Sequence, residues 1–501
     1  ILIVPAPDNS ATVLSGFPHV TLRMSDSKSV ELANEFQRQL RSKIKSLYRE
    51  GQNHHYFIPE KALRSVMARF RIQDALVAKR EQKDEIAQKI LQQGAKIFGV
   101  LILVEIGDTV VNFIEAEELE DARLPFTMEV LVKTVGLTDA AAQDFEKSQW
   151  DFLSPTFVRG TLNRRLRPKV ILPFLKDESK DKDGNFGHIF EVTLVAEHQD
   201  TAPSVELSTE SIKFPEVTLP NLFKFLRKEL DYQYDHEAEL QNLAILHKLK
   251  HPNIVELLGS FTYRGKHNIL FPLAEAGDLQ SLLEKPREGT SLQSDESLLM
   301  ALSDLASAIA QVHNCSTKEI DLELIGLHHD LRPRNILVSG NRFILADFGL
   351  STFKGVLEDS ETSAGAVVGD YIAPECEDLN RVRPRSFRRS SDIWSFGCII
   401  SEIITYMLFG HQGVKDFRDA RIQKVRIFTI KTFYDGSNTS DSGRFRDLVD
   451  LIRIMLSIEQ SERPSAEAVR ERLCRITLRN NTGRKRDFML HSSASMNSGR
   501  N

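Results

Sequence analysis

The stretch HHDLRPRNILVSGNRFILADFGLS, residues 328–351, carries the strongest chemical signal in the sequence. Asp330 and Asn335 lie in a polar segment just before an apolar strand expected at 336–338. A second expected strand, 343–346, ends directly before Asp347. The pattern predicts a short hairpin with two aspartates and an asparagine at its ends. Phosphoryl transfer requires such a set, because one carboxylate orients the accepting hydroxyl and oxygen ligands hold Mg²⁺ on the phosphates.

Further motifs follow this stretch in a fixed order. They are Ala373-Pro374-Glu375, SDIWSFG at 391–397 and ERPS at 462–465. With the loop and Asp347-Phe348-Gly349, the ordered set resembles the eukaryotic protein kinase family over about three fifths of the chain. The resemblance implies an α+β fold, in which a two-lobed protein-kinase-like catalytic domain follows a mostly α-helical domain. It also implies ATP and Mg²⁺ as cofactors and protein substrates.

The resemblance assigns roles to four residues of this stretch. Asp330 is expected to be the catalytic base that accepts the proton of the substrate hydroxyl, and Asn335 and Asp347 are expected to bind Mg²⁺. Arg332 occupies the position where serine/threonine kinases usually have a lysine on the γ-phosphate. Arginine keeps the charge but presents it as a planar fork, so its contact geometry differs from that of lysine.

Three other positions are expected to support the site. The resemblance pairs Glu375 with Arg463 in a buried ion pair, and it places Asp392 beneath the backbone of the catalytic loop.

His329 replaces an arginine that binds the activation-loop phosphate in the family. Because histidine is mostly neutral near pH 7, we hypothesise that activity does not strictly require activation-loop phosphorylation. The available phosphorylation sites are Ser351, Ser360, Thr362 and Ser363.

The glycine-rich loop of the family is only partly matched. KDGNFGHIFEV, residues 182–192, supplies Gly184 and Gly187 with Phe186 between them, while Lys182 occupies the first glycine position. Glycine lets backbone N–H groups approach phosphates. We expect Gly184, Phe186 and Gly187 to cover the nucleotide. An ordinary β-turn is an alternative interpretation of the same residues.

The lysine and glutamate that the family pairs beside the nucleotide are less clear. Lys224 in LFKFLRKEL fits the strand lysine best, and Lys213 is the competitor. Glu239 is the favoured partner on the next helix, with Glu237 as an alternative. Counting back from His251-Pro252 in the usual register of the family, however, places Asn242 at the position of the paired glutamate. If Asn242 occupies this position, the pair is absent and activity becomes doubtful.

The segment NILFPLAEAGDLQSLL, residues 268–283, resembles the family's adenine-binding linker. Pro272 has no N–H, but the family uses the carbonyl of that residue and the N–H two residues later, which Ala274 supplies. Asp278 is expected to reach the ribose or a basic substrate residue.

These features divide the chain into four parts. Apolar residues spaced three and four apart between Leu32 and Leu47 predict an amphipathic helix near the start of a helical domain. Polar composition predicts a disordered tail after the kinase domain. The predicted parts are an extension at 1–24, a helical accessory domain at 25–173, a kinase domain at 174–475 (N-lobe 174–271, hinge 272–277, C-lobe 278–475) and the tail at 476–501.

Composition excludes several classes of protein. A net charge of −5 argues against a dedicated nucleic-acid binder. The longest apolar run, 97–106, is about half the length that spans a bilayer, so no membrane span is expected. Four widely separated cysteines suggest reduced thiols in a cytoplasmic protein. The run Arg484-Lys485-Arg486 also allows a nuclear location.

Two rival hypotheses remain open at this level. The chain could be a pseudokinase that acts as a scaffold or switch, given Lys182, His329 and the unclear lysine–glutamate pair. Alternatively, the helical domain could be the main functional unit, binding a protein partner with the kinase domain as its output. The presence of Asp330, Asn335 and Asp347 together favours an active protein serine/threonine kinase.

Overall fold

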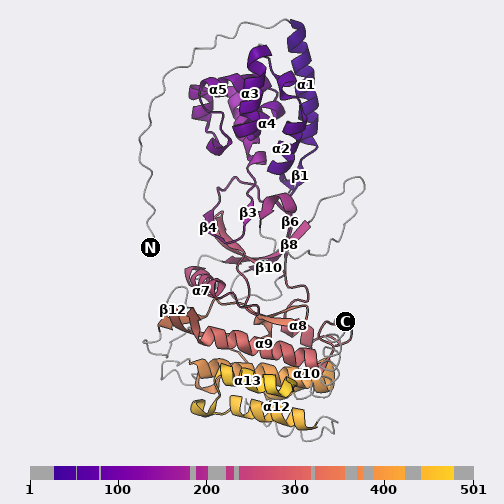
Figure 1. Cartoon of the computed structure of the whole chain (residues 1–501), viewed down its shortest axis with the longest axis vertical. Helices are drawn as coiled ribbons and strands as arrows, with labels where there is room; N and C mark the ends of the chain where they lie inside the picture. The colour runs from indigo at the N-terminus through magenta and orange to yellow at the C-terminus, as the bar shows by residue number, and fades with distance from the viewer. Residues whose placement is uncertain are drawn as a thin grey trace, which may run out of the picture.

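The chain has three parts along its long axis: a helical domain, a lobe built on a β-sheet and a second helical lobe (Figure 1). This arrangement confirms the α+β prediction of a two-lobed kinase-like domain preceded by helices. The computed structural model describes residues 27–51, 54–77, 80–180, 188–200, 222–230, 236–317, 322–355, 369–376, 388–423 and 442–478.

The helical domain is built around α4, whose residues are all buried except Lys96. This helix contains most of the apolar run at 97–106, which is therefore helical. On α1, the predicted apolar face buries Leu40 and Ile44 completely, whereas Leu32 is 59% exposed. The helices are α1 (Ser27–Lys45), α2 (Glu60–Arg69), α3 (Arg80–Gln93), α4 (Ala95–Leu103), α5 (Val110–Glu115) and α6 (Asp139–Ser148), with a short hairpin of β1 (Arg49–Glu50) and β2 (Tyr56–Phe57).

The second part is a six-stranded sheet in the order β4-β9-β10-β8-β6-β5. All neighbours are antiparallel except β4 and β9, which are parallel. β4 precedes residue 174, so the sheet extends across the predicted domain boundary. The strands are β4 (Thr161–Arg165), β5 (Phe174–Ser179), β6 (His188–Val195), β8 (Leu222–Leu230), β9 (Gly259–Tyr263) and β10 (Lys266–Pro272).

Aromatic packing and a small parallel sheet join the helical domain to this lobe. Phe157 stacks on Phe174 with ring centroids 5.6 Å apart, and both contact Phe261 of β9. His198 lies edge-on to Phe57 of the helical domain and hydrogen-bonds the carbonyl of Pro155. The parallel pair is β3 (Phe157–Val158) with β7 (Gln199–Asp200).

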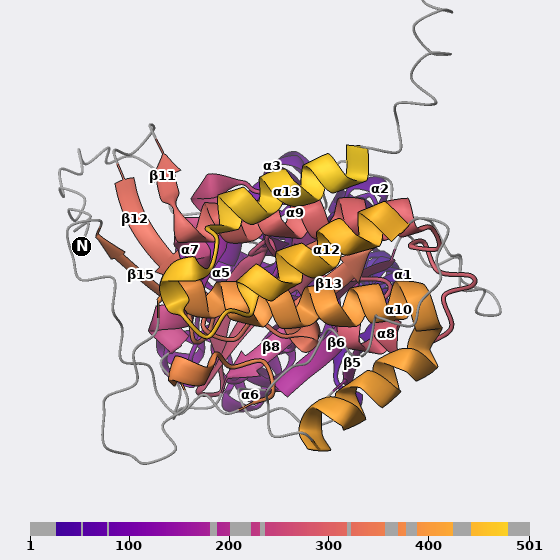
Figure 2. The same ribbon diagram turned by 90° about the horizontal axis from the view of Figure 1, so that it is seen from below.

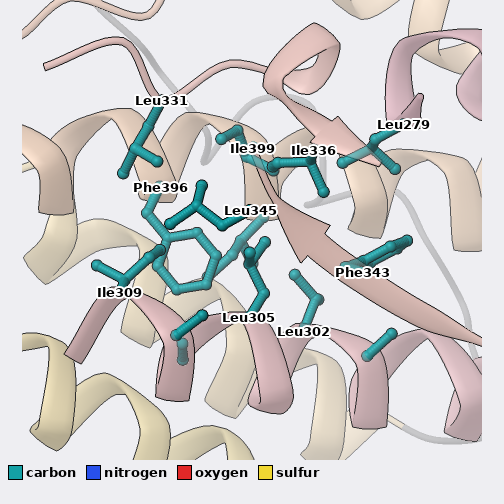
Figure 3. Packing of buried hydrophobic residues seen from close by; sticks show 14 of the residues in the cluster. Leu279, Leu302, Leu305, Ile309, Leu331, Ile336, Phe343, Leu345, Phe396 and Ile399 are labelled. Atoms are coloured by element: carbon teal, nitrogen blue, oxygen red, sulfur yellow. The ribbon is translucent and has the colours of Figure 1, made fainter. Parts of the chain in front are cut away.

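The third part is a stack of helices, of which α9, α10, α12 and α13 lie side by side (Figure 2). Its core joins these helices to the hairpin of β13 and β14 (Figure 3). Helix α7 (His236–Leu249) precedes the stack and lies beneath the sheet. The elements that follow are α8 (Leu279–Leu283), α9 (Asp295–His313), β11 (Cys315–Thr317), β12 (Leu322–Leu327), β13 (Ile336–Ser339), β14 (Arg342–Leu345), β15 (Thr352–Gly355), α10 (Arg389–Gln423), α12 (Ser442–Met455) and α13 (Ala466–Leu478).

Helix α10 is apolar because it is the central helix of this core. By length and composition it could cross a membrane, but 78% of its most apolar window is buried inside the protein. Gly410 interrupts it with φ 67°, a conformation that L side chains rarely adopt. The helix therefore changes direction there, and Arg418 and Arg421 of its second half lie near residues 329–334 and 369–372.

Candidate active site

The hairpin of β13 and β14 brings the predicted loop residues together. Ile336 pairs with Leu345, so Asn335 before the first strand and Ala346 after the second lie opposite each other. The backbone N–H of Ala346 donates to the carbonyl of Asn335 over 2.9 Å. Leu331, between Asp330 and this hairpin, packs near Phe396 and Ile399 of α10 (Figure 3). The apolar core thus fixes the ends of the polar loop.

Asp330 and Asn335 form a direct pair. Asn335 is 5% exposed, and its Nδ2 donates to the Asp330 carbonyl over 2.8 Å and to Asp330 Oδ2 over 2.7 Å. Arg332 Nε lies 3.2 Å from the same Oδ2. The hydrogen bonds from Asn335 and the charge of Arg332 orient the Asp330 carboxylate, and no described residue donates a hydrogen bond to its Oδ1.

A buried lysine joins two carboxylates from different elements. Lys228 Nζ on β8 lies 2.8 Å from Glu239 on α7 and 2.8 Å from Asp347. Burial lowers the pKa of Lys228, but the two carboxylates outweigh burial and hold that pKa above its ordinary value. Burial likewise opposes ionisation of Asp347, yet Lys228 holds the pKa of this carboxyl below its usual range. At Glu239 the balance is the opposite, because burial raises the pKa of this carboxyl and Lys228 only partly opposes it. The three groups link the two lobes.

The predicted pairing of Lys224 with Glu239 is wrong. Both lysines face the same side of β8, but Lys224 lies about 13 Å along the strand from Lys228 at ~3.3 Å per residue. It lies beyond Phe225, where pairing with β10 ends, and its ammonium contacts Glu191 on β6 at 3.1 Å. Its side chain is 55% exposed, so Lys228 takes the position that the sequence suggested for Lys224.

Lys228 was missed because it lies within a run of three charged residues, which suggests an exposed segment. Arg227, before it, is 5% exposed and makes a bidentate contact with Asp177 on β5. Glu229, after it, accepts from Arg227 and Lys266. Three successive charges are thus satisfied by different elements: Arg227 and Glu229 by neighbouring strands, and Lys228 by α7 and the segment after β14.

Asn242, the alternative to Glu239, has a different position. Its side chain is buried one turn further along α7, and Nδ2 donates to the carbonyls of Phe348 over 3.1 Å and Ser351 over 2.7 Å. It therefore ties the helix to the segment after Asp347, while Glu239 occupies the position beside the lysine. The pair that the family register placed in doubt is present.

Asp392 holds the catalytic loop from below, as the resemblance implied. Its carboxylate accepts from the backbone N–H groups of His328 over 2.8 Å and His329 over 3.0 Å, and it contacts His313 Nε2 at 2.9 Å. Burial raises the pKa of Asp392, but the hydrogen bond and charge of His313 outweigh this effect and lower it to about 2. The same carboxylate stabilises the positive φ of 68° at His329.

Glu375 and Arg463 form the second predicted ion pair. Arg463 Nη1 and Nη2 lie 2.6 and 2.8 Å from the two carboxylate oxygens, and the arginine side chain is fully buried. The guanidinium also lies 4.9 Å from the Trp394 ring centroid on α10. This bidentate contact fixes the segment around 374–376 to the helical lobe.

Comparison with known proteins agrees with this geometry. The family model described as the protein kinase domain matches residues 221–473, which is more than half of the chain. The chain belongs to the protein kinase family. The match begins after the segment at 182–192, so it includes the paired lysine, the loop and both ion pairs but not the glycine-rich stretch.

Three relatives of this kinase illustrate the likeness. The serine/threonine-protein kinase Nek2 of Homo sapiens is 32% identical over 254 residues, covering 49% of this chain and 52% of that protein. The probable serine/threonine-protein kinase nek2 of Dictyostelium discoideum is 30% identical over 245 residues, with 48% and 53% covered. The G2-specific protein kinase fin1 of Schizosaccharomyces pombe is 28% identical over 235 residues, with 44% and 29% covered. The chain spans about half the length of these two Nek2 relatives.

Strand β10 ends at Pro272, the first residue of the predicted hinge. Ala274 is buried, and its carbonyl accepts from the N–H of Gly277 over 3.1 Å. Asp278 is the N-cap of α8, because its carboxylate accepts from the N–H of Ser281 over 2.7 Å. One carboxylate oxygen of Asp278 is therefore engaged in the helix, and its predicted contact with ribose stays a prediction.

Several predicted positions lie outside the described residues. These include the nucleotide-covering residues and three of the four expected phosphorylation sites. The fourth site, Ser351, is 6% exposed, and its hydroxyl donates to the carbonyl of His328 over 3.2 Å. The positions outside are Gly184, Phe186, Gly187, Lys182, Lys213, Ser360, Thr362, Ser363 and the tail after Leu478. Residues 476–478 of the predicted tail belong to α13 instead.

The kinase family implies Mg²⁺, and the donor set at the cleft fits it. The described residues hold no group of three or more His, Cys, Asp or Glu side chains suited to a metal. Magnesium, however, usually takes only one or two protein ligands together with phosphates and water. Asn335 uses its Nδ2 to bind Asp330, which leaves its amide oxygen available, and Asp347 is held ionised by Lys228. An amide oxygen and a carboxylate are ligands that this cation prefers.

Proposed function

We propose that this chain is an active protein kinase that transfers the γ-phosphoryl group of ATP to Ser or Thr hydroxyls of proteins. The observation that carries the proposal is Lys228 lying 2.8 Å from both Glu239 and Asp347. A scaffold has no need to bury one cation between two carboxylates at this place. The arrangement also supplies a lysine–glutamate pair, whose uncertainty was one of three reasons for the pseudokinase hypothesis, beside Lys182 and His329.

The acceptor hydroxyl would be oriented by Asp330. Asn335 and Arg332 both engage Oδ2, so Oδ1 can accept the hydroxyl proton as the oxygen attacks phosphorus. Arg332, 35% exposed at the side chain, can turn toward the γ-phosphate and offset its charge. The loop that carries these groups is fixed by Asp392, so the hydroxyl meets a preorganised base.

The nucleotide would be held by residues of both lobes. Lys228 would contact the phosphates while Glu239 keeps its ammonium in place, and Pro272 and Ala274 would offer backbone groups to adenine. Asn335 and Asp347 would hold Mg²⁺, which supplies positive charge to the phosphate oxygens when it is bound. Gly184, Phe186 and Gly187 are proposed to cover the phosphates.

Serine or threonine is the proposed acceptor on two grounds. Arg332 supplies a cation where kinases of this type usually carry lysine, and two of the relatives named above are serine/threonine-protein kinases by name. A reducing, cytoplasmic setting is proposed because Cys315, Cys376 and Cys398 are free thiols buried in the core. Partner binding by the helical domain and a nuclear location also remain proposals.

A transfer assay with a paired variant tests the proposal. The purified chain is incubated with Mg·ATP and a generic protein substrate, beside the Asp330→Asn variant, and incorporated phosphate is identified by residue type. We expect phosphoserine or phosphothreonine with the wild type and a loss of about 10²–10⁴-fold in the variant, the range of general base catalysis. Equal background transfer in both proteins would overturn it.

A thermal shift on the same samples separates the cofactor question from transfer. ATP at 100 times its Kd should stabilise the fold by ~2.7 kcal/mol in the presence of Mg²⁺. Asp347→Asn should reduce the Mg²⁺-dependent part of this shift. Stabilisation without any transfer would indicate a nucleotide-binding scaffold.

A further inference from the structure

A cavity beside Asp330 has four arginines in its lining. Its volume is about 300 Å³, and it lies between the catalytic loop, residues 369–372 and the second half of α10. Arg332 and Arg334 come from the loop, whereas Arg418 and Arg421 come from α10 after its break at Gly410. Asp330 and Asp370 are the acidic residues of the lining.

One buried glutamate holds the two arginines of α10. Glu402 is fully buried and accepts from Tyr371 Oη over 2.7 Å and from Arg418 Nη2 over 2.7 Å. Arg421 Nη1 lies 3.2 Å from the other carboxylate oxygen of Glu402, and its guanidinium packs 4.6 Å from the Tyr371 ring centroid. Glu284 reaches Arg418 from the solvent side at 3.5 Å. A single buried carboxylate therefore serves a hydroxyl and two guanidinium groups.

Arg421 retains donors that nothing in the described part of the chain satisfies. Its side chain is only 6% exposed, and Nε has no hydrogen-bond partner among the described residues. Asp370 is 4.0 Å from Nη2 and is itself 55% exposed, so this contact is at the limit of an ion pair. Guanidinium groups carry five N–H donors in a planar fork that suits an oxyanion. A buried cation with free donors on a cavity wall is suited to an anionic ligand.

We propose that this arginine cavity, lined by Arg334, Arg418 and Arg421, selects acceptor peptides that carry an acidic or phosphorylated side chain close to the phosphorylated residue. The proposal rests on the proposed kinase function, because the cavity includes Asp330 and thus the place of the acceptor hydroxyl. A lysine or arginine beside the acceptor would meet like charge there, whereas a carboxylate or phosphate would complete the hydrogen bonds of Arg421.

Peptide binding tests the selectivity without requiring transfer. Three fluorescent peptides share one serine acceptor and one backbone sequence, and their flanking residues are glutamate, phosphoserine or lysine. Binding to the full chain carrying Asp330→Asn is followed by anisotropy with Mg·ATP at two salt concentrations. We expect either anionic peptide to bind at least tenfold more tightly than the lysine peptide, with a difference that shrinks at high salt.

Variants locate the selectivity in the arginine cavity. Arg421→Gln should reduce the preference at least fivefold, while Arg421→Lys should retain part of it. Arg334 is exposed and contacts only Gln280 within hydrogen-bond distance in the described chain, so Arg334→Gln offers a second test with little effect on the fold. The matched control is Arg453→Gln on α12, which pairs with Asp450 at the surface.

The outcomes are distinct. Equal binding of the glutamate and lysine peptides, or a preference that survives both Arg421→Gln and Arg334→Gln in folded protein, overturns the proposal. A preference for phosphoserine alone assigns the cavity to phosphate, and equal preference for glutamate assigns it to anions in general. Selective binding by a wild-type chain that transfers no phosphate would refute the kinase function and leave the peptide site standing. In an active enzyme the selectivity should appear in KM.

Discussion

Two buried ion pairs of this kinase use the same chemistry for different purposes. Arg463 and Glu375 are joined within the helical lobe, with the arginine side chain fully buried and the carboxylate 14% exposed. Lys228, Glu239 and Asp347 instead come from the sheet, from α7 and from the segment after β14, and the Asp347 side chain is 30% exposed. The first pair closes a bidentate contact inside one lobe. The second leaves one partner accessible where a ligand has to bind.

The difference shows that burial alone does not identify function. The charges of a closed pair can be replaced by apolar groups of similar volume, because they are satisfied inside one lobe. Arg463 also donates to the carbonyls of Ser457 and Ser390, so its replacement removes these two hydrogen bonds as well. A pair that shares its cation with an accessible carboxylate cannot be replaced in this way. Its lysine also holds the pKa of Asp347 below the usual range. The predictions below test this contrast.

The largest effect is expected in the closed pair. Arg463→Met leaves Glu375 partly buried without its cation, and removal of one partner should cost about 3–5 kcal/mol of the free energy of unfolding. Denaturant unfolding at neutral pH measures this cost. The double variant Arg463→Met/Glu375→Met should recover the part that comes from the unpaired carboxylate, but not the hydrogen bonds of Arg463 to the carbonyls of Ser457 and Ser390. If the double variant is as unstable as the single one, the stabilisation comes from those backbone contacts and not from the ion pair.

The next largest effect is expected on catalytic activity, at the pair of Lys228 and Glu239 that shares its cation with Asp347. Lys228→Met removes the cation that would contact the phosphates, so kcat/KM should fall by about 10²–10³-fold, as for other preorganised electrostatic contacts. Its apolar stem keeps much of the packing around α7. Retention of activity with a large loss of stability would place Lys228 in the same structural class as Arg463.

The pH dependence of stability should report on His329, in the loop that both pairs support. Burial lowers its pKa to about 4, while an unfolded histidine titrates near ~6.5. Between these values the unfolded state binds more protons, so stability should fall as the pH falls, by roughly 3 kcal/mol at most. His329→Gln should reduce this slope, and the part that comes from His198, whose pKa burial also lowers to about 4, should remain. The exposed His54 serves as the control, and an unchanged slope in His329→Gln contradicts the prediction.

The smallest effect is expected at Lys224. Its ammonium contacts Glu191 at the surface, and exposed pairs contribute ~0–1 kcal/mol. Lys224→Met should therefore leave both the midpoint of unfolding and kcat/KM nearly unchanged. A loss of activity comparable to that of Lys228→Met would restore Lys224 as the functional lysine.

Much of the site follows from short-range sequence. Asp330, Asn335 and Asp347 were predictable because a two-stranded hairpin lies between them, and a hairpin brings its ends together. Asp392, Glu375 and Arg463 were predictable from ordered motifs. Lys228 was not predictable as the partner of Glu239. Which lysine forms this pair depends on where β8 stops pairing with β10 and on which side chain then faces α7. The extension of the sheet by β4 was missed for the same reason, since its partner β9 lies far along the chain.

The sequence by itself determined the family, the α+β class and the polar residues of the catalytic loop, since these depend on residue identity at fixed local spacing. Only the tertiary structure decided that Lys228 pairs with Glu239, that Asn242 ties α7 to the loop, and that Arg418 and Arg421 line the cavity beside Asp330. The reason is physical. Which charges meet depends on strand register and on the break in α10 at Gly410, and both are set by packing between segments distant in sequence.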